Sequence, residues 1–545
     1  MRKIINLVGG MEDFKEKLDK AKKGQIVTFF REIDEKIDPL EFFAKLSGYG
    51  SKKSSFFLES VDIVPKYGEY SLGSASPCLR VSGNKEDFEI KALNALGKQF
   101  LKLLKKDKDL SFCDSVQYKE DLIKGKLIPT RKAVSEEKRL KLKTHMDIIR
   151  AVAFKFKPTS KYFVPYCGLF GSISYDFIDQ FEDLPENKED ILKDPDYELY
   201  FADNLFLTDH KNSKTYLIVN ALVSEDKRQN IYRNSMKILD NYEKALKTKM
   251  PKPKTYKKKK QNITTDTDKN EYISIIKDLK TNILDGDVFQ VVPSRTIIAD
   301  YNSQPLDIYK ELRKLNPSPY MFFINNSNGI LLGSSPEMFL KVEGEKEKVI
   351  EIRPIAGTKP RGLINDELDK DLDSRYESEL KIDEKEIAEH TMLIDLARND
   401  VARIAKPGSR YVDEPYIVEK YSHVQHLVSN VRGVLKDDLD ALHAYLASMN
   451  MGTLTGAPKI EAMKLIRKKE KNKRGFYGGS VGYITPSGDF DSAITIRSMR
   501  LKSNKAYIRA GAGIVYDSIP KKEYNETEKK AMACLKAIKK AGGFR

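Results

Sequence analysis

The sequence predicts an α+β fold with two regions joined by a lysine-rich segment. Runs of β-branched and aromatic residues and amphipathic helical segments both occur along the 545-residue chain, but they do not alternate strictly. This order favours an α+β arrangement over a doubly wound parallel sheet. The composition, with 40% hydrophobic and 32% charged residues, is that of a globular protein, and the length allows more than one domain.

The N-terminal region, residues 1–246, mixes predicted strands with amphipathic helices. Residues 247–265 follow as a linker, because the run MPKPKTYKKKKQN combines proline with closely spaced lysines. The expected elements before this linker are strands at 25–33, 162–177, 204–210 and 215–223, and helices at 91–106 and 228–246.

The C-terminal region, residues 266–545, opens with a predicted helix at 270–287. A long helix is expected around 383–405, ended by Pro407 and Gly408. A glycine-rich strand region at 477–499 then leads through 507–518 into a final helix. The strands expected before the long helix are 288–298, 320–326, 329–335 and 339–344.

The formal net charge of +16 raises the question of a nucleic-acid partner. Much of the lysine lies on helices that also carry Glu and Asp, and no DNA- or RNA-binding motif is present, so we interpret the charge as a solvated surface that can also attract a small dianion. No apolar run is long enough to span a bilayer. Scattered cysteines without a CxxC pair favour a reducing, cytoplasmic compartment; they are Cys78, Cys113, Cys167 and Cys534.

Two Glu-x-x-Glu pairs are the strongest candidates for a metal site. Glu386 and Glu389 lie in the long helix, and Glu523 and Glu526 lie in the final helix. Carboxylates three residues apart share one face of a helix, so two such faces would offer four carboxylates to one hard cation. Mg²⁺ prefers such oxygen ligands and keeps several waters. The alternative is that these glutamates are solvated or stabilise a helix start.

Further candidates stand in the same half of the chain. Arg497 falls in a predicted strand on a half-buried face, where it needs an anion. The glycine-rich segment 511–513 can let backbone N–H groups approach a ligand. Thr453 precedes a helix and either caps a loop or contacts an anion. His426 near an apolar strand is either a core residue or a general acid or base.

Long motifs in one order show a resemblance that covers nearly all of residues 265–540. The chain resembles component I of the anthranilate synthases, a group of chorismate-utilising enzymes, and MNMGTLTGAPK is most similar to the version found in enteric bacteria. FFLES, SLGSASPCLRV and GLFGSISYDFIDQFEDLP extend the resemblance to the N-terminal half. The other matching motifs are DGDVFQVVPSR, NPSPYMFF, SSPEMF, RPIAGTKPRG, EIAEHTMLIDLARNDVARI, YSHVQHLVSNVRG, RGFYGGSVGY and GAGIVYDSIPKKEYNETEKKA.

The resemblance implies a fold with a large, mixed-layer β-sheet core flanked by helices, and it implies roles for particular residues. The metal glutamates for Mg²⁺ match Glu389 and Glu526, with Glu386 and Glu523 as outer partners. The catalytic histidine matches His426, and Thr453 and Glu337 match further catalytic pocket positions. Chorismate contacts match Gly357, Thr358, Tyr477, Arg497, Gly511, Ala512 and Gly513. The tryptophan feedback site matches Glu59, Ser60, Pro319, Tyr320 and Met321.

Two departures separate the chain from sister enzymes. The lysine usual in the PIKGT motif of aminodeoxychorismate synthase is replaced by Ala356, and the water-activating lysine of isochorismate and salicylate synthases is replaced by Gln290. The resemblance therefore implies the conversion of chorismate and ammonia to anthranilate and pyruvate, the first committed step of tryptophan biosynthesis, with feedback by tryptophan. An aminodeoxychorismate synthase and an inactive chorismate- or tryptophan-binding regulator are the alternatives.

A partner subunit is expected because the chain has no GxCxGxQ nucleophile motif of a glutamine amidotransferase. Ammonia would then come from glutamine on that separate subunit. The resemblance implies a heterotetramer of two large and two small subunits, with chorismate as substrate and L-tryptophan as inhibitor. No nucleic acid or membrane is expected to take part.

Overall fold

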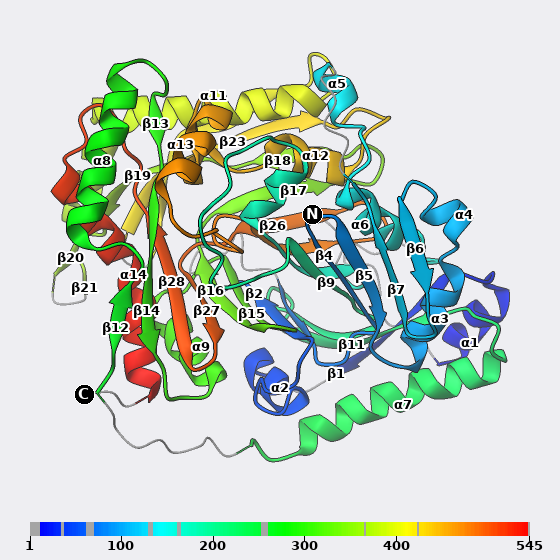
Figure 1. Cartoon of the computed structure of the whole chain (residues 1–545). Coiled ribbons are helices and arrows are strands. Elements are labelled where there is room, and N and C mark those ends of the chain that lie inside the picture. Colours follow the sequence, from blue (N-terminus) through cyan, green and yellow to red (C-terminus); the bar gives the residue numbers. More distant parts are fainter. Residues whose placement is uncertain are drawn as a thin grey trace.

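The computed structural model describes residues 11–33, 37–61, 70–128, 135–160, 165–251, 260–364, 367–421 and 424–542. Two large β-sheets form the centre of the molecule, and helices lie around them (Figure 1). Every pair of neighbouring strands in these ranges is antiparallel. The α+β prediction, with a sheet core flanked by helices, is confirmed.

The first sheet has eleven strands within the described ranges. In spatial order its strands are β1 (Ile26–Ile33), β11 (Lys214–Leu222), β10 (Asn204–Asp209), β3 (Tyr70–Ser74), β2 (Ser55–Glu59), β15 (Tyr320–Asn326), β16 (Gly329–Ser335), β27 (Ser498–Lys502), β28 (Lys505–Gly511), β14 (Ser294–Asp300) and β12 (Ile263–Thr265).

The second sheet has thirteen strands in the described part of the chain. Their order is β19 (Ile355–Pro360), β23 (Val424–Val434), β18 (Val349–Ile352), β17 (Met338–Glu343), β26 (Phe490–Ile494), β25 (Ser480–Ile484), β8 (Leu169–Ile173), β9 (Tyr197–Phe201), β4 (Leu79–Asn84), β5 (Asp87–Ala92), β7 (Leu122–Lys126) and β6 (Ser115–Tyr118), with β22 (Tyr411–Lys420) also paired to β23. Two short hairpins or pairs stand apart: β13 (Gln290–Val291) with β24 (Gly456–Ala457), and β20 (Leu363–Ile364) with β21 (Glu367–Leu368).

Strands from before and after the predicted linker are neighbours in both sheets. In the first sheet β2 pairs with β15, and in the second β8 pairs with β25. Residues 252–259 of the predicted linker lie outside the described residues. The linker at 247–265 therefore stays a prediction. The sheets themselves join the two regions, because strands of both regions pair within each sheet.

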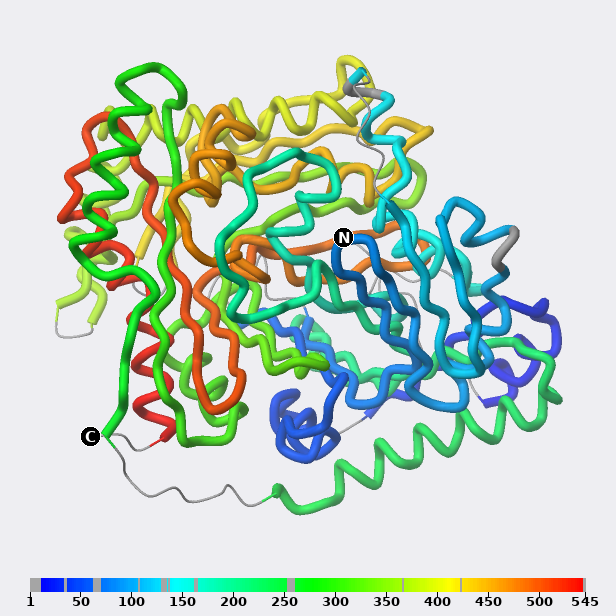
Figure 2. Tube along the Cα trace, in the orientation of Figure 1, coloured from blue at the N-terminus to red at the C-terminus, as the bar shows by residue number. Residues whose placement is uncertain are grey.

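Helices border the sheets on opposite sides of the molecule. The helix α7 (Arg228–Lys247) packs against β11 along one border, and α11 (Glu384–Ile404) packs against β19 and β23 along the other (Figures 1 and 2). The helix α14 (Pro520–Gly542) packs against α8 (Lys269–Leu284), α9 (Pro305–Leu315) and β28. The remaining helical segments are α1 (Met11–Lys20), α2 (Pro39–Leu46), α3 (Ala95–Leu103), α4 (Lys106–Asp109), α5 (Glu136–Arg139), α6 (His145–Ala153), η1 (Tyr175–Gln180), α10 (Lys370–Ile382), α12 (Ala441–Ser448), η2 (Gly452–Leu454) and α13 (Lys459–Lys469).

The chain passes directly from one sheet to the other at four short crossings within the described ranges. These crossings are residues 75–78, 202–203, 336–337 and 495–497. The last two bring Glu337 and Arg497 to places where a strand leaves one sheet and enters the other. The fold therefore fixes these two residues from both sheets at once.

Three local differences from the sequence predictions have physical causes. Arg497 does not lie within a strand: β26 ends at Ile494, β27 begins at Ser498, and Arg497 has a φ of 48° because the chain changes sheet there. The predicted strand 288–298 is divided into β13 and β14 near Pro293, which has no N–H for a sheet. In the described part of 162–177, residues 165–177, the strand is limited to β8 and is followed by the turn η1.

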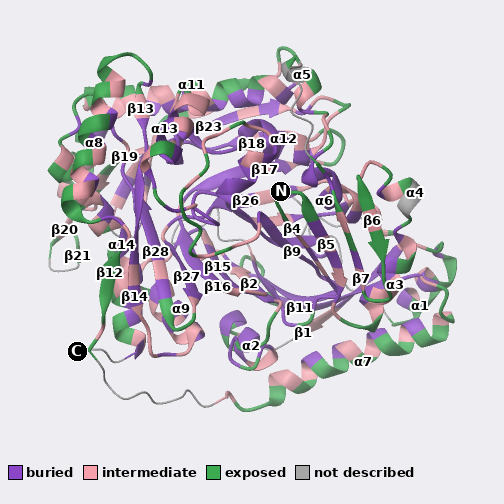
Figure 3. Cartoon of the chain, in the orientation of Figure 1, coloured by how far each residue is buried: buried purple, intermediate pink, exposed green. Residues whose placement is uncertain are grey.

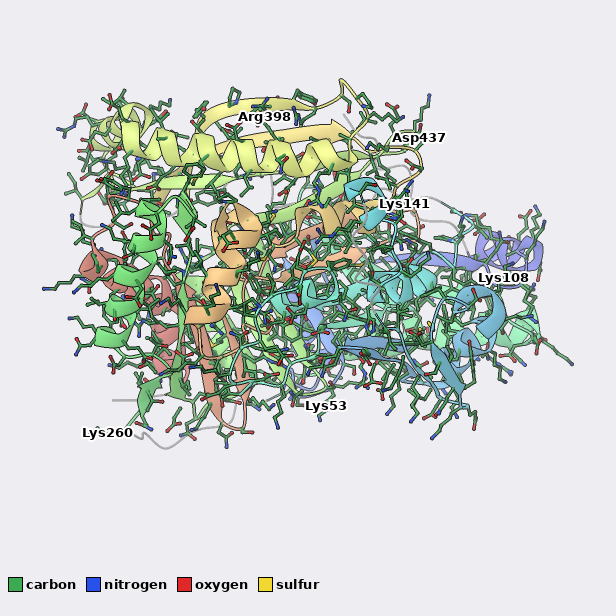
Figure 4. The ribbon with its side chains drawn as sticks, turned by 45° about the horizontal axis from the view of Figure 1, so that its top comes forward. Lys53, Lys108, Lys141, Lys260, Arg398 and Asp437 are labelled. Atoms are coloured by element: carbon green, nitrogen blue, oxygen red, sulfur yellow. The ribbon has the colours of Figure 1, made fainter. Side chains whose placement is uncertain are left out.

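Buried residues fill the sheets, whereas exposed residues line the outer sides of the helices (Figure 3). The labelled cations Lys53, Lys108, Lys141, Lys260 and Arg398 lie at separate places around the outline of the molecule (Figure 4). This distribution fits the interpretation of the basic charge as a solvated surface. All four cysteines are free thiols. Among the described residues, no helix combines the length and apolar character needed to cross a membrane.

Candidate active site

The two predicted acidic pairs come together from α11 and α14. Burial raises the pKa of Glu389; Lys385 opposes this shift, and the negative charges of Glu386, Glu523 and Glu526 add to it. Burial likewise raises the pKa of Glu386 and of Glu523. The four carboxylates therefore share one region, and a cation there would relieve their mutual repulsion.

Lysines neutralise part of this acidic cluster. Lys530 Nζ lies 2.6 Å from Glu526 Oε1 and donates to the carbonyl of Gly511 at 2.9 Å, while Lys385 Nζ lies 3.7 Å from Glu389 Oε1. In the part of the chain that is described, no three His, Cys, Asp or Glu side chains converge as a metal site requires. The cluster has oxygen donors suited to a hard cation, and its carboxylates are now partly held by lysines.

Capping explains why the first acidic pair stands at a helix start. Asp383 caps α11, and its carboxylate accepts from the N–H of Glu386 at 3.3 Å. The start of α11 lies against the bulge of β19, where a Cβ on Gly357 would lie 3.0 Å from Glu386 Oε2. Gly357 has a φ of 66°, a conformation that glycine adopts without strain. The bulge thus places the backbone of β19 directly beside the acidic cluster.

His426 in β23 lies opposite the same bulge. Its Nδ1 is 3.0 Å from the carbonyl oxygen of Gly357 and 2.9 Å from Thr358 Oγ1. Because a carbonyl only accepts hydrogen bonds, we infer that Nδ1 carries the proton and that Nε2 has the free lone pair. Burial lowers the pKa of His426 to about 4, although the Gly357 carbonyl opposes this shift. The imidazole is therefore neutral at physiological pH. His426 does not rest as the imidazolium that a general acid would require.

Glu337 and Thr453 form a second polar group beside Arg497. Burial raises the pKa of Glu337 to about 7, and Thr453, Arg497 and Lys530 oppose this shift. Glu337 Oε1 and Thr453 Oγ1 are both buried and have no partner of normal hydrogen-bond geometry among the described residues. Buried polar atoms of this kind are usually satisfied by a ligand or water, so both atoms point to a binding site.

Arg497 lies at the centre of the predicted residues. Burial lowers the pKa of Arg497, whereas Tyr477, Cys534, Glu526 and Glu337 raise it. Its positive charge also contributes to the lowered pKa of His426. A partly buried arginine with a positive φ, among carboxylates and a tyrosine, is suited to hold an anionic group.

Tyr477 completes this side of the site. Its hydroxyl lies 3.3 Å from the place where a Cβ on Gly511 would stand, so it lies over the end of β28. Ala512 and Gly513 follow that strand, and a Cβ on Gly513 would lie 2.9 Å from Gln290 Nε2. The structure therefore brings Tyr477 and the 511–513 segment, two of the predicted substrate contacts, close to each other and to Gln290.

The two segments of the predicted tryptophan site also meet. Glu59 at the end of β2 pairs with Met321 in β15. Glu59 is buried and accepts from Tyr309 Oη at 2.7 Å and from Arg313 Nε at 3.1 Å. Ser60 Oγ is buried with no hydrogen-bond partner among the described residues. The Ser60 hydroxyl is available to a ligand, whereas the Glu59 carboxylate is already engaged.

Next to this pair, Pro319 is buried, and Tyr320, which is partly exposed, begins β15. The Tyr320 hydroxyl donates to Asp491 Oδ1 of β26 at 3.1 Å, which links the predicted tryptophan segment to the second sheet. Burial raises the pKa of Tyr320 well above its ordinary value, so the phenol stays protonated.

Sequence reasoning missed an ionic group that holds Tyr477. Glu470, Arg474 and Arg509 are buried and bonded to one another. Arg474 belongs to the motif RGFYGG, three residues before Tyr477, and this proximity was the available signal. Arg509 precedes Gly511 by two residues. Its connection to Arg474 through Glu470 depends on strand and helix contacts that no local sequence pattern reveals.

Known proteins resemble this chain over most of its length. A family model described as chorismate binding enzyme matches residues 117–536. Anthranilate synthase component 1 of Buchnera aphidicola subsp. Acyrthosiphon pisum is 43% identical over 513 residues, which cover 92% of this chain and 95% of that protein. The protein of the same name from Vibrio cholerae is 41% identical over 508 residues, covering 92% of this chain and 94% of its own length.

Solved structures show the same fold. Anthranilate synthase component I from Streptococcus pneumoniae superposes with a TM-score of 0.66 at 29% identity, covering 86% of this chain and 92% of that chain. The menaquinone-specific isochorismate synthase from Escherichia coli gives a TM-score of 0.64 at 16% identity, covering 97% and 98%, and supports the fold alone.

The fold and the site thus define a two-sheet α+β protein with a partly buried arginine beside a carboxylate cluster. The chain belongs to the family of chorismate-binding enzymes. The resemblance predicted from the motifs is confirmed, including the similarity to component 1 of the anthranilate synthases.

Proposed function

We propose that the chain is the large subunit of an anthranilate synthase. In this reaction chorismate and ammonia give anthranilate, pyruvate and water. The observation that carries the choice is Gln290, whose neutral amide lies against Gly513 in the substrate-contact segment, where sister enzymes that use water carry a basic lysine. Ala356 in β19 removes the lysine typical of aminodeoxychorismate synthases. Both residues favour ammonia as nucleophile and an aromatic amine as product.

The substrate would bind between Arg497 and the acidic cluster. Arg497 and Tyr477 hold the enolpyruvyl carboxylate, and the backbone of 511–513 with Gly357 and Thr358 lines the ring. Glu389 and Glu526 would hold Mg²⁺, with Glu386 and Glu523 as outer partners. When bound, Mg²⁺ would offset the negative charge of the ring carboxylate. The raised pKa values of Glu386, Glu389 and Glu523 support this assignment, because such carboxylates gain from a nearby cation.

The protein groups divide the proton transfers between them. Ammonia adds at C2 of chorismate while the C4 hydroxyl leaves, which gives 2-amino-2-deoxyisochorismate; loss of the C2 proton and of pyruvate then makes the ring aromatic. Glu337 is partly protonated near neutral pH and is suited to protonate the leaving hydroxyl, with Thr453 beside it. Neutral His426, with Nε2 free, is suited to accept a proton rather than to donate one.

Ammonia would come from glutamine on a separate amidotransferase subunit, in a heterotetramer of two large and two small subunits in the cytoplasm. The name component 1 of the relatives supports a partner, since it implies a second component. L-Tryptophan would bind at Glu59, Ser60, Pro319, Tyr320 and Met321 and inhibit the enzyme. The buried, unpartnered hydroxyl of Ser60 supports this site.

Product analysis tests the proposal. The purified chain, chorismate, Mg²⁺ and ammonium at mildly alkaline pH should yield anthranilate, detected by its fluorescence and by chromatography, and an equal amount of pyruvate. Salicylate, or stable aminodeoxychorismate as the main product, would replace the assignment by one of the sister activities. Chorismate binding without turnover under any of these conditions would favour the inactive regulator.

A further inference from the structure

Glu470 lies at a buried point between two guanidinium groups. Arg474 donates from Nη2 to Glu470 Oε1 at 2.6 Å and from Nε to Oε2 at 3.0 Å. Arg509 donates from Nη2 to Oε2 at 2.6 Å, and Ser294 donates to Oε1 from N at 2.7 Å and from Oγ at 2.8 Å. We call Glu470, Arg474 and Arg509 the buried ion triad. Burial opposes ionisation of Glu470, but the two arginines lower its pKa, so the carboxylate is ionised.

Arg474 binds three separate parts of the candidate active site. Its Nη1 donates to the carbonyl of Leu454 at 2.7 Å, next to Thr453, and its Nη2 donates to the carbonyl of Val292 at 2.7 Å, between β13 and β14. The guanidinium carbon lies 5.9 Å from the centre of the Tyr477 ring and 4.5 Å from that of Tyr175. These contacts connect the 452–454 turn, the Gln290 segment and Tyr477.

Arg509 connects the same carboxylate to the remaining part. It lies in β28, two residues before Gly511, and its Nη1 donates to the carbonyl of Lys473 at 2.7 Å. The Tyr477 hydroxyl lies over Gly511, 3.3 Å from the position of a Cβ there. Glu470 therefore couples the turn that carries Tyr477 to the strand end that Tyr477 covers.

The N-terminal region supports this turn as well. The Ser174 hydroxyl donates to the carbonyl of Gly475 at 2.7 Å, and the N–H of Gly475 donates to Asp176 Oδ2 at 2.7 Å. Gly475 has a φ of 57°. The turn between Arg474 and Tyr477 is thus held on both sides.

Buried ion pairs often contribute little net stability, because desolvation opposes the attraction between the charges. A group with this many directed bonds is better explained by the geometry that it imposes. We propose that Arg474 is a positioning residue for chorismate: through Glu470 it fixes Tyr477, the Thr453 turn and the 511–513 segment relative to one another. The inference rests on chorismate being the substrate, as proposed above, and adds a residue that does not itself touch it.

The test is Arg474→Lys, which keeps a positive charge beside Glu470 but loses the guanidinium fork. The KM for chorismate should rise about 10- to 100-fold, since small misplacements of binding groups have effects of this size. The matched control is Arg150→Lys, which alters another bidentate arginine, paired with Asp147 and Asp440 away from the candidate site. The control should keep the parent KM, and both variants should keep the parent circular dichroism spectrum.

Coupling to Tyr477 separates positioning from a general loss of structure. If Arg474 acts through Tyr477, Arg474→Lys should change the KM much less in a Tyr477→Phe background than in the parent. Effects that simply multiply, or an Arg474→Lys variant with the KM of the control, would overturn the inference. If Arg474→Lys does not fold, Arg509→Lys tests the same carboxylate from the Gly511 side, with the same expected KM and the same coupling.

Chorismate consumption is the readout, so the inference and the proposed function fail in different ways. Turnover to a product other than anthranilate would overturn the proposed function while the KM comparison still decides the role of Arg474. Normal anthranilate formation with an unchanged KM in Arg474→Lys would overturn the positioning role alone. A parent chain that neither consumes chorismate nor binds it in calorimetry would overturn both.

Discussion

Burial shifts the pKa values of two residues of the site, Glu337 and His426, in opposite directions. Burial raises the pKa of Glu337 to about 7 and lowers that of His426 to about 4. At pH 7 about half of the Glu337 carboxyl groups are therefore protonated, while the imidazole is neutral. Two groups separated in this way can serve as donor and acceptor in the same turnover.

The pH profile of Glu337→Gln tests the donor role. At constant free ammonia, kcat/KM for chorismate in the parent should fall as the pH rises through about 7, because Glu337 loses the proton that the leaving hydroxyl needs. The variant should be about 100-fold slower or worse and should lack this pH-dependent fall. A Thr453→Val variant should keep it, and equal profiles in parent and Glu337→Gln would refute the role.

The metal role is tested by Glu389→Gln and Glu526→Gln. Each should reduce Mg²⁺-dependent turnover by about a thousandfold or more, because a charged ligand is lost while the fold is kept. Glu384→Gln, an exposed change in the first turn of α11, is the matched control and should stay close to the parent. Rates measured across a Mg²⁺ titration decide the matter. Near-normal rates with unchanged Mg²⁺ dependence in either variant would contradict the metal role of that glutamate.

At the scale of elements, the pairing of β2 with β15 brings distant segments together. Ser318, just before β15, accepts from Ser334 Oγ at 2.8 Å, and the N–H of Ser334 donates to the carbonyl of Arg497 at 3.1 Å. Only two residues, Ser318 and Ser334, therefore stand between Pro319 of the predicted tryptophan segment and Arg497, the proposed substrate anchor. A ligand that shifts β15 would act on Arg497 through this short connection.

Ser60→Phe should relieve inhibition by L-tryptophan and spare catalysis, because the ring would fill the space beside the Ser60 hydroxyl. In the parent, L-tryptophan should raise the apparent KM for chorismate, with a coupling of about 1–3 kcal/mol. The chain contains no tryptophan, so binding can be followed by the fluorescence of the ligand itself. Full sensitivity in Ser60→Phe, or no inhibition of the parent, would show that the site is misplaced or lost.

At the scale of the whole molecule, neither sheet belongs to one end of the chain. The edge that β25 offers is covered by β8, and the edge of β15 is covered by β2. Removing one region would leave these long strand edges unpaired, which proteins generally avoid. The two regions are therefore expected to fold as one cooperative unit.

Splitting the chain tests this expectation. Residues 260–545 expressed alone should aggregate or stay unfolded, whereas co-expression with residues 1–251 should restore ammonium-dependent anthranilate formation. Solubility, circular dichroism and turnover of the two preparations are compared. A stable, active 260–545 fragment would show that the second region folds independently.

Glutamine dependence should belong to the complex alone. The isolated chain should use ammonium but not glutamine, because it lacks the amidotransferase nucleophile motif. Addition of a cognate amidotransferase subunit should confer glutamine-dependent turnover. Glutamine use by the isolated chain at the rate seen with ammonium would rule out the need for a partner.

The sequence predicted those features that depend on neighbouring residues. Helix α11 is fixed by its Asp383 cap and the stop before Pro407, and both acidic pairs fell on the helices expected. The motifs identified Arg497 but not its conformation. The chain crosses from one sheet to the other at this residue, and that crossing depends on strand partners far away in sequence. The ion triad was missed for the same reason: Glu470 and Arg509 meet only after β28 and α13 have packed.

The crossings at 336–337 and 495–497 leave very little slack. A crossing of two residues can span at most about 7 Å, and one of three residues at most about 10 Å. Neither sheet can therefore shift far without also moving Glu337 and Arg497. The distance between Glu337, the proposed proton donor, and Arg497, the proposed anion-binding residue, therefore depends on how the two sheets are aligned. Chimaeras with relatives should tolerate breakpoints in outer loops and lose activity when one sheet is exchanged without the other.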